Sequence, residues 1–167
     1  MTTNQAPAGD PAPVGRPAAI PFPPEQRASF AEQWSSLPGM QHLGARADFS
    51  DARVCRVIID PVQPFHRGGT GTDAVNGAVI AGLCDAAVGM VGHFQHAGKR
   101  VGTAQLSIQF LRPLRGDRVV VEAWPTRAGG TLVFARAEAR DAEGVVCAVC
   151  DGIVAAIAAP AGGGPVL

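Results

Sequence analysis

The sequence predicts an α+β fold in which a curved antiparallel sheet wraps around one long central helix. One apolar stretch, residues 76–94, is long enough for four helical turns and contains a single charged side chain. After Gly98 the apolar residues alternate with a period of two, in four segments separated by short turns that contain glycine. A β-branched segment before the helix, within residues 47–60, adds a strand at the edge of this sheet.

The composition is that of one soluble domain. A chain of 167 residues is long enough to form a hydrophobic core. Its 14 basic and 14 acidic residues cancel and form no basic run, so we expect neither nucleic acid nor a membrane as a partner. The proline-rich N-terminus has no signal-peptide core, and no apolar run reaches the roughly 20 residues that span a bilayer. We therefore expect a cytoplasmic protein.

Changes in composition divide the chain into four parts. The expected parts are a disordered or irregular N-terminal extension (residues 1–25), an N-terminal helix and loop (26–46), the sheet-and-helix domain (47–157) and a flexible C-terminal tail (158–167). In the second part, Phe30, Trp34 and Leu37 recur at helical spacing. Pro38 and Gly39 are expected to end this helix.

Each element of the main domain has its own signal. Asn76 is suited to cap the central helix, which must be enclosed because it is apolar on nearly every face. In the next strand, Leu106 and Phe110 are expected on one face and Thr103 on the other, unless a bulge turns the chain. Three further strands are expected within residues 117–124, 131–140 and 145–157.

Cys147 and Cys150 form a C-x-x-C pair, which raises the question of a metal or redox site. The pair falls within a predicted strand, where positions three apart face opposite sides. No second pair or flanking histidine completes a set of metal ligands. We therefore expect neither a metal nor a redox cofactor, and we interpret the four cysteines as ordinary buried thiols: Cys55, Cys84, Cys147 and Cys150.

Asp85 is the only Asp, Glu, Lys or Arg between positions 74 and 98. The residues one helical turn away from it are small or apolar, namely Ala81, Gly82, Val88 and Gly89. They leave room beside the carboxylate and supply no charge partner, so a bound water would be its natural companion. Two interpretations stay open: a catalytic carboxylate, or a structural aspartate bonded to a neighbouring backbone loop.

Two segments of the chain, NGAVIAGLCDAAVG (76–89) and QLSIQFLRPLRGDRVVVEA (105–123), point to a known family. They resemble the hotdog-fold acyl-CoA thioesterases of the PaaI-like group, and the resemblance covers about residues 47–157. It implies a hotdog fold and the hydrolysis of an acyl-CoA thioester to the free acid and coenzyme A. It implies no cofactor besides the coenzyme A of the substrate.

The resemblance also assigns individual residues. Asp85 falls where the family has its catalytic carboxylate, which acts as general base or nucleophile. Gly77 falls on the first glycine of the family's His-Gly-Gly motif, whose backbone N–H polarises the thioester carbonyl. Thr103 falls where some members carry a hydroxyl that orients the attacking water. Asn76 replaces the histidine of the motif, as a further donor or as a helix cap, and Ala78 replaces its second glycine.

The remaining candidates lie near the start of the central helix. Thr70 stands where many family members have Asn or Gln on the preceding loop. Arg112 and Arg115 either hold the phosphates of coenzyme A or are ordinary surface residues at a turn. His66 either lines the acyl entrance or is a loop histidine without a role. With Ala78, these four residues complete the expected substrate-binding set.

The spacing between Gly77 and Asp85 has a consequence for assembly. Eight residues on one helix span about 12 Å, whereas a hydrogen bond spans about 3 Å. Both residues therefore act on one carbonyl only if they come from different chains. We expect a two-fold homodimer in which the helix start of one subunit lies near Asp85 of its partner, with room for a tetramer at the sheet edges.

Two alternatives stay open. In the first, the chain is a non-catalytic acyl-CoA or small-molecule binding or scaffold protein of the same fold, and the altered motif reflects lost chemistry. In the second, it catalyses the hydration or dehydration of an enoyl-CoA thioester. Relatives with that activity pair an aspartate with a histidine five residues later, but Asp85 is followed there by Met90 and Asp73 by Ala78. We rank this alternative last.

Overall fold

The structure is a computed structural model that describes residues 19–68, 73–97 and 99–157. Thr70, the predicted tail and most of the predicted N-terminal extension lie outside these ranges. The elements in chain order are α1 (Pro24–Ser35), α2 (Pro38–His42), β1 (Arg46–Asp48), β2 (Cys55–Ile59), a 3-10 helix (Pro64–His66), α3 (Gly77–Gln95), β3 (Arg100–Phe110), β4 (Val119–Ala128), β5 (Leu132–Arg140) and β6 (Val146–Ile157).

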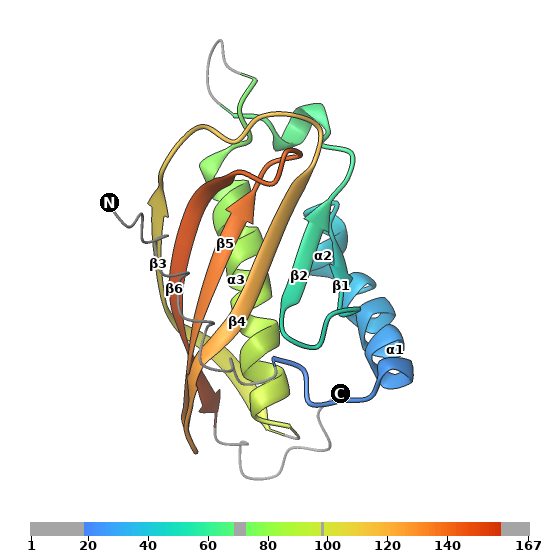
Figure 1. Cartoon of the computed structure of the whole chain (residues 1–167), viewed down its shortest axis with the longest axis vertical. Coiled ribbons are helices and arrows are strands. Elements are labelled where there is room, and N and C mark those ends of the chain that lie inside the picture. Colours follow the sequence, from blue (N-terminus) through green and yellow to red (C-terminus); the bar gives the residue numbers. More distant parts are fainter. Residues whose placement is uncertain (1–18, 69–72, 98, 158–167) are drawn as a thin grey trace, which may run out of the picture.

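The strands form one antiparallel sheet in the order β1-β2-β4-β5-β6-β3. The sheet curls around α3, which packs against β2, β3, β4, β5 and β6. In Figure 1 β4 and β5 pass in front of this helix. The predicted α+β fold, with a curved antiparallel sheet around a long central helix, is confirmed.

Two glycines let α3 and β6 approach each other closely. A Cβ atom at Gly92 would lie 2.2 Å from Cγ1 of Val154, and one at Gly152 would lie 2.6 Å from Cγ1 of Val88. Both distances are far shorter than a van der Waals contact between carbon atoms, so a larger residue at either position would push the helix off the strand. The close contact determines which side of α3 faces the sheet and which side faces away.

By length and composition alone, α3 is apolar enough to cross a membrane. However, 50% of its most apolar stretch is buried inside the protein. Its buried residues include Leu83, Ala87 and Val91, which belong to the same hydrophobic core as the inward-facing residues of the sheet. The apolar character of the helix is therefore accounted for by the core that it forms.

The two N-terminal helices lie at the β1 end of the sheet, far from β3 (Figure 1). The first helix ends at Ser35, and Pro38 begins α2 in addition to ending the helical run before it. Proline is tolerated there because the first helical position has no intrahelical hydrogen bond to lose. Phe30 of α1 packs against Phe94 of α3 with 5.6 Å between ring centroids, so α1 extends the core over the end of the central helix.

All four cysteines are buried and free of disulfides, as predicted. Cys150 lies beside Cys84 of α3, close enough for the two thiols to share a hydrogen bond. Cys147 lies elsewhere, with its Sγ 3.6 Å from Oδ2 of Asp141. The two members of the C-x-x-C pair therefore have different surroundings.

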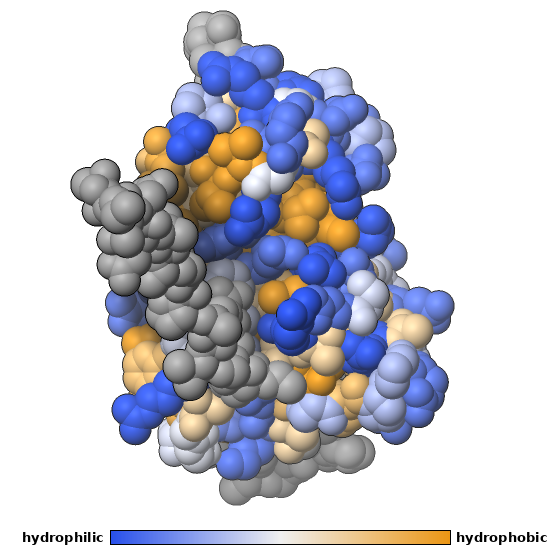
Figure 2. Space-filling model, in the orientation of Figure 1, coloured by the Kyte–Doolittle hydropathy of each residue, from blue (hydrophilic) through white to orange (hydrophobic). Residues whose placement is uncertain are grey.

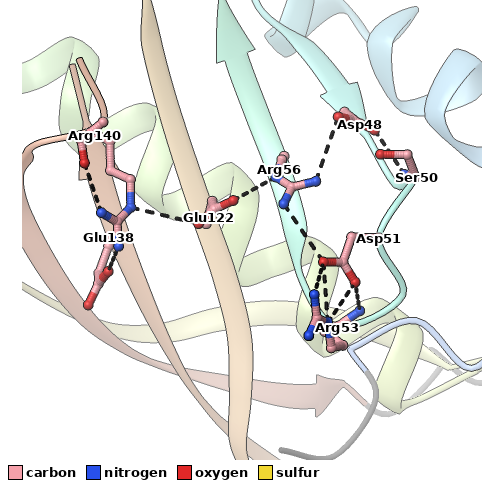
Figure 3. Close-up of polar contacts among 9 residues, drawn as sticks. Asp48, Ser50, Asp51, Arg53, Arg56, Glu122, Glu138 and Arg140 are labelled. Carbon is pink, nitrogen blue, oxygen red and sulfur yellow. Dashed lines mark hydrogen bonds and ion pairs between the residues drawn. The ribbon is translucent and has the colours of Figure 1, made fainter. Parts of the chain in front are cut away.

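The face of the sheet that points away from α3 carries a network of ion pairs (Figure 3). Glu122 accepts a hydrogen bond from Nε of Arg56 at 2.6 Å and lies 3.7 Å from Nε of Arg140, which also pairs with Glu138. Asp48 and Asp51 lie within 4.0 Å of the Arg56 guanidinium. We call these six residues the outer-face network. Figure 2 shows this face as largely hydrophilic, with separate hydrophobic areas in its upper half.

Candidate active site

Asp85 lies on the side of α3 that points away from the sheet. Its side chain is exposed, and it makes no ion pair or hydrogen bond with any residue that the structure describes. The accessible residues around it are small. They are Ala78, Ala81, Gly82 and Gly89, and we call these four together with Asp85 the α3 strip.

The expectation that α3 is enclosed on every side is wrong for the single chain. A sheet covers one side of a helix, and here it buries the larger apolar side chains of α3. The α3 strip lies on the remaining side, where the described residues of the chain leave it partly or fully accessible. The carboxylate of Asp85 is therefore open to water and to a ligand.

The cap at the start of α3 leaves the first backbone donor of the helix, the Gly77 N–H, unused. Oδ1 of Asn76 accepts a hydrogen bond from the Ala78 N–H at 2.8 Å, which is the capping role anticipated as one of two alternatives. The Asn76 N–H donates to the His66 carbonyl at 2.8 Å. Among the described residues, no acceptor binds the Gly77 N–H. This amide therefore points its free hydrogen out of the helix start, where the helix dipole adds positive charge.

An open groove of about 470 Å³ lies beside this free amide. Phe110 forms one wall, and its ring is so close that a Cβ atom at Gly77 would lie 3.3 Å from its Cζ. Arg112 lies on the rim, and its guanidinium has no partner among the described residues. We call this the helix-start groove. Its apolar floor and single cation suit a ligand that is part apolar and part anionic.

The second predicted phosphate ligand, Arg115, is already paired. Its Nε donates to Oδ1 of Asp73 at 2.7 Å. This hydrogen bond holds the pKa of the Asp73 carboxyl below its usual value. Of the two arginines, Arg112 is therefore the one whose charge remains available to a ligand.

Thr103 lies on the face of β3 that points toward α3, opposite to the simple prediction. It pairs with Val154 of β6, while Leu106 pairs with Gly152, and directly paired residues share a face. A β-bulge between Thr103 and Gln105 inserts one extra residue and reverses the alternation upstream of it.

The bulge places the Thr103 hydroxyl near the α3 strip. A Cβ atom at Gly89 would lie 3.9 Å from Oγ1 of Thr103. Gly89 is one helical turn beyond Asp85, and its lack of a side chain leaves space between the hydroxyl and the carboxylate. The structure therefore brings Thr103 and Asp85 to one side of the helix.

The ring of His66 is buried and has a structural role. Its Nδ1 accepts a hydrogen bond from the Gln63 N–H at 2.9 Å, and its Nε2 donates to the Leu43 carbonyl at 2.9 Å. Both ring nitrogens are therefore occupied by backbone groups. His66 anchors the loop that leads to α3, and a role at the acyl entrance stays a prediction.

A second hollow, of about 390 Å³, lies between α1 and the C-terminal half of α3. Six residues line it: Phe30, Gln33, Trp34, Ser36, Leu37 and His93. The rings of Trp34 and His93 meet edge to face with 5.4 Å between centroids. We call this the α1 hollow. Sequence reasoning missed it, although the helical spacing of its aromatic residues was the available signal.

These residues fall into two groups within one chain. Gly77 and Arg112 line one groove at the start of α3, while Asp85 and Gly89, with Thr103 next to Gly89, lie near its middle. Because α3 is continuous from Gly77 to Gln95, about 12 Å of helix separates the free amide from the carboxylate. A single chain therefore presents the two halves of a site at two separate places.

Comparison with protein families matches residues 73–148 to the thioesterase superfamily. This range includes the free amide, the carboxylate and Thr103, but not α1. The comparison with curated proteins found no match.

Solved structures share the fold at low sequence identity. A thioesterase of Haemophilus influenzae is 22% identical with a TM-score of 0.69, and the match covers 84% of this chain and 94% of that one. The PaaI protein of Escherichia coli, from the phenylacetic acid degradation operon, is 20% identical with a TM-score of 0.67, covering 80% and 93%. A thioesterase family protein of Silicibacter pomeroyi is 21% identical with a TM-score of 0.69, covering 82% and 100%. The predicted hotdog architecture is confirmed.

Proposed function

We propose that this chain hydrolyses an acyl-CoA thioester to a free acid and coenzyme A, because residues 73–148 match the thioesterase superfamily. The superfamily match suggests hydrolysis of a thioester. That the thiol part of this thioester is coenzyme A is part of our proposal. The observation that carries the proposal is Asp85. It is a carboxylate on the open side of an otherwise apolar helix, with no cation beside it among the described residues. Such a group contributes no ion pair to the fold of the single chain and is available to a substrate.

Thioester hydrolysis needs a base or nucleophile and a donor for the carbonyl oxygen. In our proposal, Asp85 removes a proton from a water molecule as that water adds to the thioester carbon. The Gly77 N–H donates to the oxygen as it becomes negative. The C–S bond then breaks, and the departing thiolate takes the proton held by Asp85. Direct attack by the carboxylate, followed by hydrolysis of the anhydride, would use the same two residues.

Thr103 is suited to position the attacking water. Its hydroxyl lies on the α3 side of β3, near the space left by Gly89. A hydroxyl both donates and accepts hydrogen bonds, so it can hold a water molecule beside the Asp85 carboxylate without competing for its charge.

We further propose that the site forms between two copies of the chain. The free amide and the carboxylate lie about 12 Å apart on one helix, so a second chain has to supply one of them. Two features favour a two-fold dimer. Ala78, Ala81 and Gly82 of the α3 strip are small enough to let another helix approach there, and β3 is an edge strand of the sheet formed by the described residues.

The helix-start groove would then hold the coenzyme A portion of the substrate. Arg112 places an unpaired guanidinium on its rim, and coenzyme A carries phosphates that such a group binds through paired hydrogen bonds. The apolar residues of the groove, among them Phe110 and Leu111, suit the less polar arm that joins the phosphates to the sulfur.

The test is release of free thiol from a panel of acyl-CoA substrates, with Asp85→Asn as the matched variant. Asparagine keeps the shape of the side chain and removes its basicity. We expect turnover by the wild-type protein and its near-complete loss in the variant. Tight binding of acyl-CoA without turnover by the wild type would replace this proposal with the non-catalytic alternative, and equal turnover by both proteins would remove Asp85 from the mechanism.

A further inference from the structure

The α1 hollow and the helix-start groove differ in charge. The groove has the Arg112 guanidinium on its rim. The α1 hollow has no carboxylate, lysine or arginine in its lining, and its one titratable residue is His93. Burial lowers the pKa of His93, which favours the neutral ring. The groove therefore suits the anionic part of an acyl-CoA, and the hollow suits an apolar part.

One side of α3 runs from the carboxylate to His93, which lines the α1 hollow. Asp85, Gly89 and His93 are spaced four residues apart, so they form one row along the helix surface. Gly89, in the middle of the row, has no side chain to block it. The eight residues from Asp85 to His93 span about 12 Å.

We propose that the α1 hollow binds the far end of the acyl chain, and that the protein consequently prefers straight acyl groups of about ten carbons. This inference rests on the thioesterase function proposed above. An extended alkyl chain with C–C bonds of about 1.5 Å advances about 1.25 Å per carbon, so about ten carbons cover the distance from Asp85 to His93. An acetyl group, or one ring joined directly to the carbonyl, ends before it reaches Trp34.

The walls of the hollow favour such a chain. Phe30 and Trp34 are half-buried on the face of α1 that packs toward α3, and Leu37 is 40% exposed at the rim. An alkyl chain laid against these three side chains would remove their remaining apolar surface from water. Because α1 lies outside residues 73–148, acyl-length selection would depend on a segment outside the superfamily match.

The test measures kcat/KM for straight acyl-CoA substrates of two to sixteen carbons. We expect a maximum near ten carbons. Trp34→Ala and Leu37→Ser should lower the ratio of kcat/KM for decanoyl-CoA to that for acetyl-CoA by about tenfold, since each removes apolar contacts that only the longer substrate makes. Gly89→Leu should lower the same ratio, because the leucine side chain would fill the space over position 89 that the longer acyl chain has to cross. Glu32→Ala, an exposed residue of α1 that does not line the hollow, is the matched control and should leave the ratio unchanged.

A binding experiment separates selection from turnover. In the Asp85→Asn background, decanoyl-CoA should change the fluorescence of Trp34 and acetyl-CoA should not, with Trp34→Phe identifying the signal of that residue. Hydrolysis with no dependence on acyl length, or a ratio unmoved by all three variants, would overturn this inference and leave the proposed function standing. Absence of both hydrolysis and acyl-CoA binding would overturn the two together.

Discussion

Glu122 and Asp85 are two carboxylates on opposite sides of the same layered structure. Glu122 lies on the outer face of the sheet, 2.6 Å from Arg56 and 3.7 Å from Arg140 (Figure 3). Asp85 lies on the open side of α3 without a cation among the described residues. Each partly exposed pair of the first kind contributes at most about 1 kcal/mol to folding. The comparison indicates that the charge of Glu122 contributes to the fold, whereas the charge of Asp85 makes no ion pair among the described residues, in line with the catalytic role that we propose for it.

The largest effect expected from this comparison is the loss of activity in Asp85→Asn. A general base contributes about 10² to 10⁴ in rate, so kcat/KM for the preferred acyl-CoA should fall by that factor. The free energy of unfolding should change by less than about 0.5 kcal/mol, because the exposed carboxylate has no hydrogen-bond or ion-pair partner among the described residues. Thiol release and urea denaturation measure the two quantities. A variant that unfolds readily would assign Asp85 to the structure instead.

The next largest effect concerns the donor at the start of α3. Gly77→Pro removes the free N–H at the one helical position where proline is well tolerated, and the extended backbone of Asn76 is compatible with a following proline. We expect kcat to fall by about 10² to 10³, the usual cost of deleting one oxyanion donor.

Gly77→Ala is the matched control for that donor. It keeps the N–H, and its Cβ would meet only the ring of Phe110, which is 55% exposed and free to shift. Activity close to that of the wild type is expected. Equal losses of activity in the alanine and proline variants would indicate that activity depends on the space at Gly77 and not on its amide.

Two glycines of α3 distinguish the covered side of the helix from the open side. Gly92→Ala places a Cβ 2.2 Å from Val154 and should destabilise the protein by about 1–3 kcal/mol. Gly89→Ala meets only Oγ1 of Thr103, at 3.9 Å, and should stabilise the helix by about 0.5–1 kcal/mol. Chemical denaturation of both variants measures the difference. Similar stabilities would contradict the assignment of the two sides.

Glu122→Gln should lower the stability of the protein and leave its activity unchanged, whereas Asp85→Asn should do the reverse. It removes the charge that faces Arg56 and Arg140, and about 0.2–1 kcal/mol of stability should be lost. Thioesterase activity should not change, because the outer face lies across the sheet from α3. A strong loss of activity would mean that the two faces are coupled.

The smallest effect concerns Asp51, at the end of the outer-face network. Hydrogen bonds from Arg53 lower the pKa of its carboxyl to about 2, from an ordinary value of 3.8. Because the folded-state pKa is the lower one, the associated stability is fully present above about pH 4 and is lost as the pH falls through about 2. Asp51→Asn should therefore be slightly less stable than the wild type at pH 6 and should approach it in stability as the pH falls below about 2. Unfolding at a series of pH values checks the convergence.

Periodicity predicted the elements that depend on local sequence. The apolar run around Asp85 predicted α3, and the alternation after Gly98 predicted the strands, because both signals reflect one face of one element meeting the core. The exposure of Asp85 was not predicted, since it depends on which side of the helix the finished sheet covers. The true orientation of Thr103 depends on a one-residue bulge that leaves no mark in the alternation.

The free amide and the α1 hollow illustrate the same limit. The resemblance pointed to Gly77, but only the hydrogen bond from Ala78 to Asn76 showed which amide the cap consumes. Trp34 and His93 are 59 positions apart in the sequence and meet only because α1 folds over the end of α3. Contacts of this kind follow from the tertiary arrangement, and local sequence patterns carry no information about it.

The central claim is that Asp85 of one subunit acts with the Gly77 amide of its partner. Mixing Asp85→Asn and Gly77→Pro chains under conditions that exchange subunits tests it most directly. With random pairing, half of the dimers are mixed and each has one intact site, so about a quarter of the wild-type activity should return from two inactive parents. A mixture that exchanges subunits and stays as inactive as its parents would contradict the claim.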